Sequence, residues 1–69
     1  MFDMPLSKYV GSQYEIICDR KNHNVKILKK DRQIAEYHFD KFGNAITFYA
    51  KLKTNKAIKE ADSIAMNYY

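Results

Sequence analysis

The sequence predicts an α+β fold in which a four-stranded antiparallel meander is packed on one face by a C-terminal helix (ββββα). Two observations lead to this prediction. Apolar residues alternate along most of residues 14–52, which is typical of half-buried strands, and apolar spacing becomes helical after residue 54. We expect one domain over residues 1–69, with an N-terminal arm (1–13), an antiparallel sheet (14–52) and a helix (55–68).

The N-terminal segment MFDMPLSKYVGSQ is compatible with two structures. Pro5 and Gly11 bracket a short stretch that is either an arm or an additional edge strand. The residues of this segment do not separate the two alternatives.

The first predicted hairpin lies in YEIICDRKNHNVKILKK. A loop at Lys21–Asn24 sets Cys18 opposite Ile27, and it also places Asp19 opposite Lys26 and Glu15 opposite Lys30. A slip of one residue would lose both charge pairs, so the pattern favours this register. A short bulged loop at 31–33 then sets Ile27 beside Tyr37 and Val25 beside Phe39.

The segment YHFDKFGNAITFYAKL has two interpretations. As a hairpin with a four-residue loop at Lys41–Asn44, it pairs Phe39 with Ile46 and Tyr37 with Phe48, and Gly43 takes the positive φ of a turn. As a helix beginning at Asn44, it buries Ala45, Phe48, Tyr49 and Leu52. We favour the hairpin because the helix leaves the alternation of Tyr37 and Phe39 without a partner strand.

The last segment, NKAIKEADSIAMNYY, predicts a helix with Thr54 as its N-cap. Its apolar stripe is Ala57, Ile58, Ala61, Ile64, Ala65 and Tyr68. The alanines suit close packing across a sheet, so we expect this stripe to cover one sheet face.

Size and composition limit the classes of protein. A chain of 69 residues buries only about 60% of its unfolded surface, and association with a second copy is a common remedy. One cysteine, no visible signal peptide and no apolar run near 20 residues predict a cytoplasmic protein that is not inserted in a membrane.

Catalytic and cofactor signatures are not recognisable in the sequence. Two glycines are too few for a phosphate-cradling loop, and Cys18, His23 and His38 lack the spacing of metal ligands. His38 between Glu36 and Asp40 resembles an acid–base cluster, although such residues are more often solvated. We predict no catalytic residue, no metal and no cofactor.

The sheet face opposite the helix is predicted to be a contact surface. The registers place on it four apolar residues among balanced charges, and a patch of this size on a small protein favours association. We therefore predict a homodimer, in which twofold symmetry is the commonest arrangement. The expected interface residues are Ile17, Leu28, Ile34 and Tyr49.

The net charge of +4 raises the prospect of a polyanionic partner. Lysines gather along the first hairpin and again from residue 51 to residue 59, and the two groups form a basic band if the fold brings them together. The expected nucleic-acid contacts are Lys26, Lys30, Lys51 and Lys53, with Tyr49 as a stacking platform and Tyr9, Phe42 and Tyr69 as further aromatic candidates.

Four antiparallel strands followed by a helix, over Tyr14–Tyr68 of a small basic chain, resemble the single-stranded nucleic-acid-binding domains of the positive cofactor four and Whirly type. The resemblance lies in the order of elements. It implies a dimer that binds single-stranded DNA or RNA on its sheets. The alternative function is a protein-interaction module, such as a phage-type accessory protein.

Overall fold

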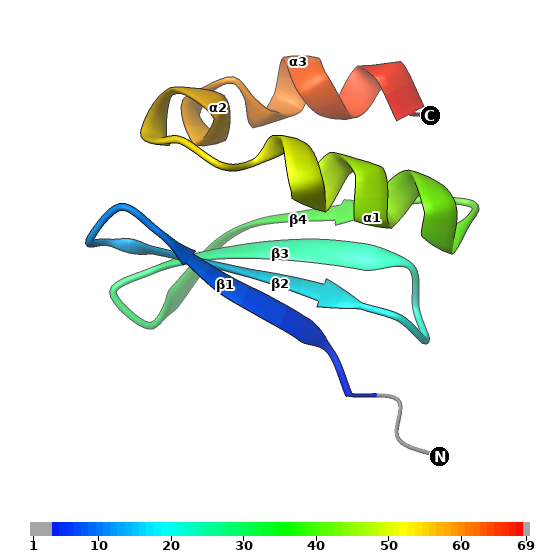
Figure 1. Cartoon of the computed structure of the whole chain (residues 1–69), viewed down its shortest axis with the longest axis horizontal. Helices are drawn as coiled ribbons and strands as arrows, with labels where there is room; N and C mark the ends of the chain where they lie inside the picture. The colour runs from blue at the N-terminus through cyan, green and yellow to red at the C-terminus, as the bar shows by residue number, and fades with distance from the viewer. Residues whose placement is uncertain (1–3, 69) are drawn as a thin grey trace.

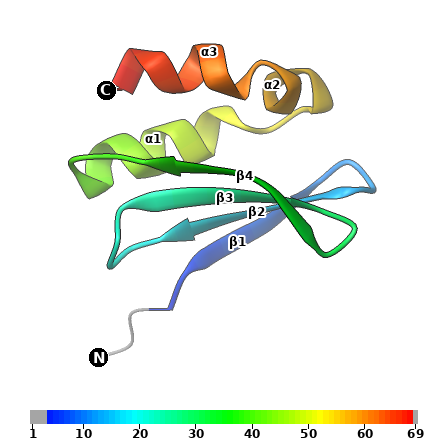
Figure 2. The same cartoon turned by 180° about the vertical axis from the view of Figure 1, so that it is seen from behind.

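A computed structural model describes residues 4–68 and has two layers, an antiparallel sheet and a set of short helices. The sheet has the order β1-β2-β3-β4, so every strand pairs with its neighbour in sequence. All the helices lie on one face of the sheet, and the other face is open (Figures 1 and 2). The elements are β1 (Leu6–Val10), β2 (Tyr14–Asp19), β3 (Asn24–Lys29), β4 (Arg32–His38), α1 (Phe42–Lys51), α2 (Asn55–Lys59), α3 (Ala61–Ala65) and the 3₁₀ turn η1 (Met66–Tyr68).

The predicted class and strand number are confirmed, but the four strands are not the predicted four. The first strand, β1, comes from the segment expected to be an arm, which settles that alternative in favour of an edge strand. It pairs with β2 through Leu6 opposite Cys18 and Val10 opposite Tyr14. Residues 45–51, expected to be the fourth strand, are helical instead.

The predicted hairpin with a loop at Lys41–Asn44 is therefore wrong. Residues 42–51 form α1, and Ala45, Phe48 and Leu52 at helical spacing are completely buried. Gly43 lies inside this helix and does not take a positive φ. The alternation and the helical spacing are both real: the first belongs to β4 and its exit, and the second to a helix packed on them.

Rings from β4 and α1 explain why the hairpin looked convincing. The Phe48 ring lies 4.9 Å from that of Tyr37 at an edge-on angle of 61°, and 5.3 Å from that of Phe39. The expected contact between Tyr37 and Phe48 exists, but it joins a strand to a helix rather than two strands. Aromatic side chains reach far enough to pair in either geometry.

The predicted register of β2 and β3 is wrong by two residues. Cys18 lies opposite Val25, and Ile16 lies opposite Ile27. Asp19 closes the turn at the end of β2, because its carboxylate accepts hydrogen bonds from the backbone N–H groups of Lys21 and Asn22. The turn has the predicted length but lies one residue earlier, so the partner of each residue changes by two positions and every side chain stays on its expected face.

The β3–β4 connection, in contrast, is shorter than expected. Lys30 and Asp31 form a two-residue turn in which both have positive φ, 52° and 66°. Val25 consequently lies opposite Tyr37, and Ile27 opposite Ala35, where we expected Ile27 beside Tyr37. The expected irregularity appears as a shift in register between Ile27 and Leu28.

The C-terminal helical stripe is buried as predicted, but the helix is interrupted, and α1 rather than this segment makes the main helical contacts with β2 and β3. The Thr54 hydroxyl accepts a hydrogen bond from the Ala57 N–H at 3.0 Å, as expected of an N-cap. The axis breaks at Glu60, between α2 and α3. Both layers contribute to the core, whose buried apolar members are Val10, Ile16, Cys18, Val25, Ile27, Phe39, Ala45, Phe48, Leu52, Ile58, Ala61 and Ala65.

Candidate nucleic-acid interface

The five residues predicted to contact nucleic acid do not share one surface. Lys26 points to the open face of the sheet, since it alternates with the buried Val25 and Ile27. Lys51 ends α1 and Lys53 follows it, and both are exposed in the helical layer on the other side. Lys30 stands at the β3–β4 turn.

Tyr49 is not on the open face, where both the interface and the stacking predictions placed it. It lies in α1 and is half-buried against β1. The Lys8 Nζ is 4.3 Å from the centre of the Tyr49 ring and donates a hydrogen bond of 2.7 Å to the Tyr49 carbonyl oxygen. Burial raises the pKa of the Tyr49 hydroxyl, with a smaller contribution from Cys18. Tyr49 therefore ties α1 to the sheet edge.

Lys8 itself was not singled out in the sequence. Its pKa is lowered by burial and, to a smaller extent, by the charge of Lys53. The positive charge of Lys53 therefore acts on Lys8 at this edge of the sheet.

The other aromatic candidates occupy different parts of the molecule. Tyr9 is 77% exposed on the outer strand of the open face. Phe42 begins α1, and the Arg20 guanidinium lies 5.9 Å from its ring centre. Tyr69 lies outside the described residues. Tyr9 is therefore the described candidate whose ring is most available to a base.

Of the three remaining interface candidates, Ile17 and Leu28 share the open face, and Ile34 lies at the irregularity of the edge strand β4. Ile17 and Leu28 are half-buried on the open face by neighbouring side chains, and Ile34 is 50% exposed. Tyr9 extends the same apolar area toward β1. None of the helices formed by residues 4–68 lies over this face (Figure 2).

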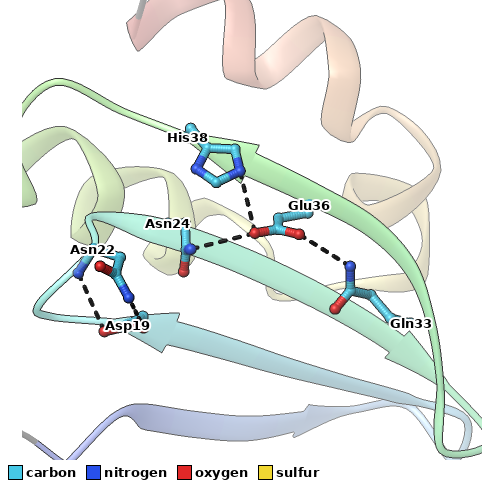
Figure 3. A network of polar contacts seen from close by, with 6 residues as sticks. All are labelled: Asp19, Asn22, Asn24, Gln33, Glu36 and His38. Carbon is cyan, nitrogen blue, oxygen red and sulfur yellow. Dashed lines mark hydrogen bonds and ion pairs between the residues drawn. The ribbon is translucent and has the colours of Figure 1, made fainter.

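A polar network crosses one end of the open face (Figure 3). The Glu36 carboxylate accepts hydrogen bonds from the Asn24 side-chain amide at 3.3 Å and from the Gln33 amide at 3.1 Å, and His38 Nε2 lies 3.1 Å from it. Asn24 is only 5% exposed, and its Oδ1 has no hydrogen-bond partner among residues 4–68. The cluster of His38 and Glu36 noted in the sequence is thus joined to β3 by an amide rather than to Asp40.

Burial accounts for the state of the single cysteine thiol, that of Cys18. Cys18 is fully buried, and burial raises the pKa of its thiol, so it remains protonated near neutral pH. Residues 4–68 contain no cluster of three or more histidines, cysteines and carboxylates that could hold a metal ion. No helix within the described part is long and apolar enough to cross a membrane.

One end of the molecule is hollowed. At this end the β1–β2 turn, the β3–β4 turn and α2 come together (Figure 1). Three adjoining hollows meet there and share walls. We call them the turn pocket, about 220 Å³ (Ser12, Gln13, Tyr14, Lys29, Asn55, Lys59), the edge hollow, about 400 Å³ (Lys29, Lys30, Arg32, Ile34), and the face hollow, about 150 Å³ (Tyr9, Ser12, Gln13, Glu15, Leu28, Lys30, Asp31).

Positive charge dominates this end. Four cations line the hollows, while the two carboxylates, Glu15 and Asp31, border only the face hollow. The turn pocket contains one lysine from each of the two basic groups noted in the sequence, Lys29 from the hairpin and Lys59 from the helix. Their approach depends on the tertiary fold, and no local pattern indicates it.

Lys30 is held in an unusual backbone conformation at the tip of the β3–β4 turn. Two-residue turns of this type favour asparagine, aspartate or glycine at both central positions, because each has positive φ. Lys30 has φ 52° and an exposed side chain. The Lys30 ammonium is therefore exposed to solvent at a position whose backbone conformation is unfavourable for lysine.

Comparison with known proteins adds no relative: no protein-family model, curated protein or solved structure matches this chain. The class established by the structure is a small α+β domain whose sheet is covered by helices on one face. The resemblance to single-strand-binding domains stays a prediction.

Proposed function

We propose that this protein is a non-enzymatic binding protein for single-stranded nucleic acid, and that the strand's backbone follows the hollowed end of the molecule. The observation that supports it best is the meeting of four cations, Lys29, Lys30, Arg32 and Lys59, around three adjoining hollows. Lysine and arginine bind phosphates without reading sequence. Tyr9, on the rim of the face hollow, offers a ring on which one base can stack.

The backbone conformation of Lys30 is a second observation in favour of phosphate binding, because a lysine at this position lowers the stability of the fold. A left-handed conformation costs an ordinary residue about 1–2 kcal/mol, and asparagine is much less affected. If only folding mattered, asparagine would serve better at this position. The presence of a lysine at this position is consistent with a need for its charge.

The decisive variant is Lys30→Asn. We expect it to raise the free energy of unfolding by up to about 1 kcal/mol and to weaken oligonucleotide binding at the same time. The slope of log K against log salt should become shallower by ~0.7, the value for one phosphate contact on a single strand. Opposite changes in stability and affinity rule out unfolding as the cause of weaker binding.

The matched control is Lys21→Asn, which removes the same charge from the β2–β3 turn at the opposite end (Figure 1). Fluorescence anisotropy with labelled single strands and duplexes measures both variants. Equal losses from Lys21→Asn and Lys30→Asn would indicate general attraction to a basic protein and contradict a site at the hollowed end. No binding by the wild type at tens of micromolar would remove the nucleic-acid proposal.

Tyr9→Ala tests the stacking contribution. We expect a loss of roughly 1–3 kcal/mol on single strands and much less on duplex, whose base faces are already stacked. Tyr49→Phe is a useful comparison, because it keeps the ring beside Lys8. Because the Tyr49 ring already packs against Lys8, we do not expect a base to stack on it, and Tyr49→Phe should change oligonucleotide affinity little.

A second surface supports self-association. The open face has apolar residues at Tyr9, Ile17 and Leu28, with Ile34 at its edge, and charges of both signs, so a second copy related by a twofold axis can match it. Four strands of about six residues span roughly 19 Å by 20 Å, or about 400 Å² of flat area. That is small beside a typical 800 Å² per partner, so the dimer should be weak, with micromolar dissociation.

Light scattering across micromolar concentrations tests the dimer. Leu28→Lys should abolish it, while Thr47→Lys, which adds the same charge to the exposed side of α1, should not. A mass of 8.2 kDa throughout the range would contradict self-association. If Thr47→Lys abolished the dimer and Leu28→Lys did not, the interface would lie on the helical layer. A chain that neither dimerises nor binds oligonucleotides favours the alternative, a module for a different protein.

A further inference from the structure

The turn pocket joins the two layers of the molecule. Ser12, Gln13 and Tyr14 come from the β1–β2 turn and the start of β2, and Lys29 ends β3. The helical side is formed by Asn55 and Lys59, which are four residues apart on α2 and therefore on the same side of it. The pocket thus exists only when α2 is docked on the sheet.

Contacts at the β1–β2 turn hold these walls close together. Gly11 has φ 62°, and a Cβ added there would lie 2.6 Å from the Asn55 Oδ1, so the absence of a side chain lets Asn55 approach the turn. The Lys30 N–H donates a hydrogen bond of 3.3 Å to the Gln13 carbonyl oxygen, which joins the same turn to the end of β3. The walls are therefore positioned by the backbone as well as by side chains.

Charge in the turn pocket is uncompensated. Lys29 and Lys59 both line it, its lining includes no carboxylate, and neither lysine forms an ion pair within residues 4–68. The Lys29 ammonium lies 5.7 Å from the centre of the Tyr14 ring, so it is held by an aromatic face rather than by an anion. Two like charges facing one polar cavity favour an anionic ligand.

The other lining groups narrow the class of anion. Ser12, Gln13 and Asn55 supply a hydroxyl and two amides, all able to donate hydrogen bonds to oxygen. A volume of about 220 Å³ is below the range of about 300–1,000 Å³ typical of sites for larger ligands. A phosphate monoester carries roughly −1.5 to −2 at neutral pH, which matches two lysines better than the single charge of a backbone diester.

We infer that the turn pocket binds a phosphate monoester group, with Lys29 and Lys59 as its charge partners. The inference deepens the proposed function and rests on it in one respect: the terminal phosphate of a nucleic-acid strand is one source of this group. A free phosphorylated small molecule is the other source. The recognised chemistry is the same in both.

Inorganic phosphate is the first probe, and its binding to the full chain is measured by NMR. We expect saturable shifts of the Gln13, Tyr14 and Lys59 amide signals in the wild type. Lys59→Gln should weaken binding by about tenfold, as expected for loss of a charged hydrogen bond, and Lys59→Arg should largely retain it. Lys56→Gln is the matched control, because Lys56 is exposed on the same helix and does not line the pocket.

Oligonucleotides separate the two sources. We expect a 5′- or 3′-phosphorylated single strand to bind more tightly than its hydroxyl-ended counterpart, and the difference to disappear in Lys59→Gln. Saturable binding of phosphate without an end effect assigns the pocket to small phosphorylated molecules. Phosphate binding without oligonucleotide binding supports the pocket and overturns the proposed function.

The opposite results overturn the pocket. Absence of saturable shifts up to tens of millimolar phosphate would do so, as would equal losses in Lys56→Gln and Lys59→Gln. Oligonucleotide binding that is independent of Lys59 and of the phosphorylated end would then leave the proposed function standing alone. Urea unfolding of each variant confirms that the compared chains are folded.

Discussion

The two faces of the sheet differ far more in burial than in composition. On the covered face, Ile16 and Ile27 are at most 1% exposed. Their sequence neighbours on the open face, Ile17 and Leu28, are only half-buried. Alternation decides which residues share a face, but it does not decide which face is covered. The helical layer makes that decision, and it covers one side only (Figures 1 and 2).

Polar groups follow the same division. The open face holds the Glu36 network with Asn24, Gln33 and His38 (Figure 3). On the covered face, Lys8 of the edge strand is an exception, and its ammonium reaches the Tyr49 carbonyl and ring at the border of α1. A charge is tolerated on the covered side because an edge strand lets it find a partner near solvent.

The largest expected effect on the free energy of unfolding is seen when a side chain of the covered face is truncated and compared with one of the open face. Ile27→Ala should lower the free energy of unfolding by about 2–5 kcal/mol, since it leaves a cavity under the helices. Leu28→Ala, one residue away on the open face, should cost about 1 kcal/mol or less. Urea titration of both variants at low concentration measures the difference. Equal costs would mean that the open face is buried in an assembly even at that concentration.

The contact between the turn and the helical layer depends on Gly11. Gly11→Ala should destabilise by about 1–2 kcal/mol, because alanine disfavours the positive φ of this position. It should also displace Asn55, which would otherwise meet the new Cβ. The same change in an Asn55→Ala chain should cost less, because only the backbone term remains. An unchanged midpoint in Gly11→Ala would contradict the close approach of α2.

Gly43 provides the opposite test, because it lies inside α1. A Cβ there meets nothing within 4 Å, so Gly43→Ala should stabilise the protein by roughly 0.5–1 kcal/mol through helix propensity. Thermal unfolding measures the gain. A loss of stability would instead support the turn that the sequence suggested. Gly11→Ala and Gly43→Ala are therefore expected to have opposite signs.

The smallest effect concerns Asp19, at the end of β2. Hydrogen bonds from the Asn22 side chain and then from the Lys21 backbone lower the pKa of its carboxyl below the ordinary value of 3.8. Because the folded pKa is the lower one, its stabilising contribution is complete above the ordinary value and is lost as pH falls through the folded pKa. An NMR titration should place the Asp19 midpoint below 3.8. A midpoint at or above it would mean that the turn is not closed by this carboxylate.

Much of the sheet was predictable, because its signals are local and repeated. The segments of β2, β3 and β4 were identified, and the side chains of the first hairpin were assigned to the correct faces despite a two-residue error in register. An even slip preserves the faces because side chains alternate with a period of two. The register itself depended on the Asp19 turn and on positive φ at Lys30 and Asp31, where no glycine marks the turn.

Less of the candidate site than of the sheet could be predicted from the sequence. Lys30 was predicted as a contact, but Lys29 and Lys59 were noted only as members of two separate basic groups, Arg32 was not predicted as a contact, and Tyr49 was assigned to the wrong face. These errors have one origin: residues 42–51 were interpreted as a strand. Once α1 is a helix, Tyr49 leaves the open face and α2 reaches the β1–β2 turn.

By itself, the sequence determined the class of the fold, three strand segments, the N-cap at Thr54 and the buried stripe of residues 57–68. Each of these depends on propensity or periodicity within one segment, which short-range interactions suffice to decide. The tertiary structure decided that β1 completes the sheet, that 42–51 is a helix, and that Lys29 and Lys59 line one pocket. Residues 39–52 suit either a strand pair or a helix locally, and burying Ala45, Phe48 and Leu52 against the sheet favours the helix. Only contacts between distant segments supply that free energy.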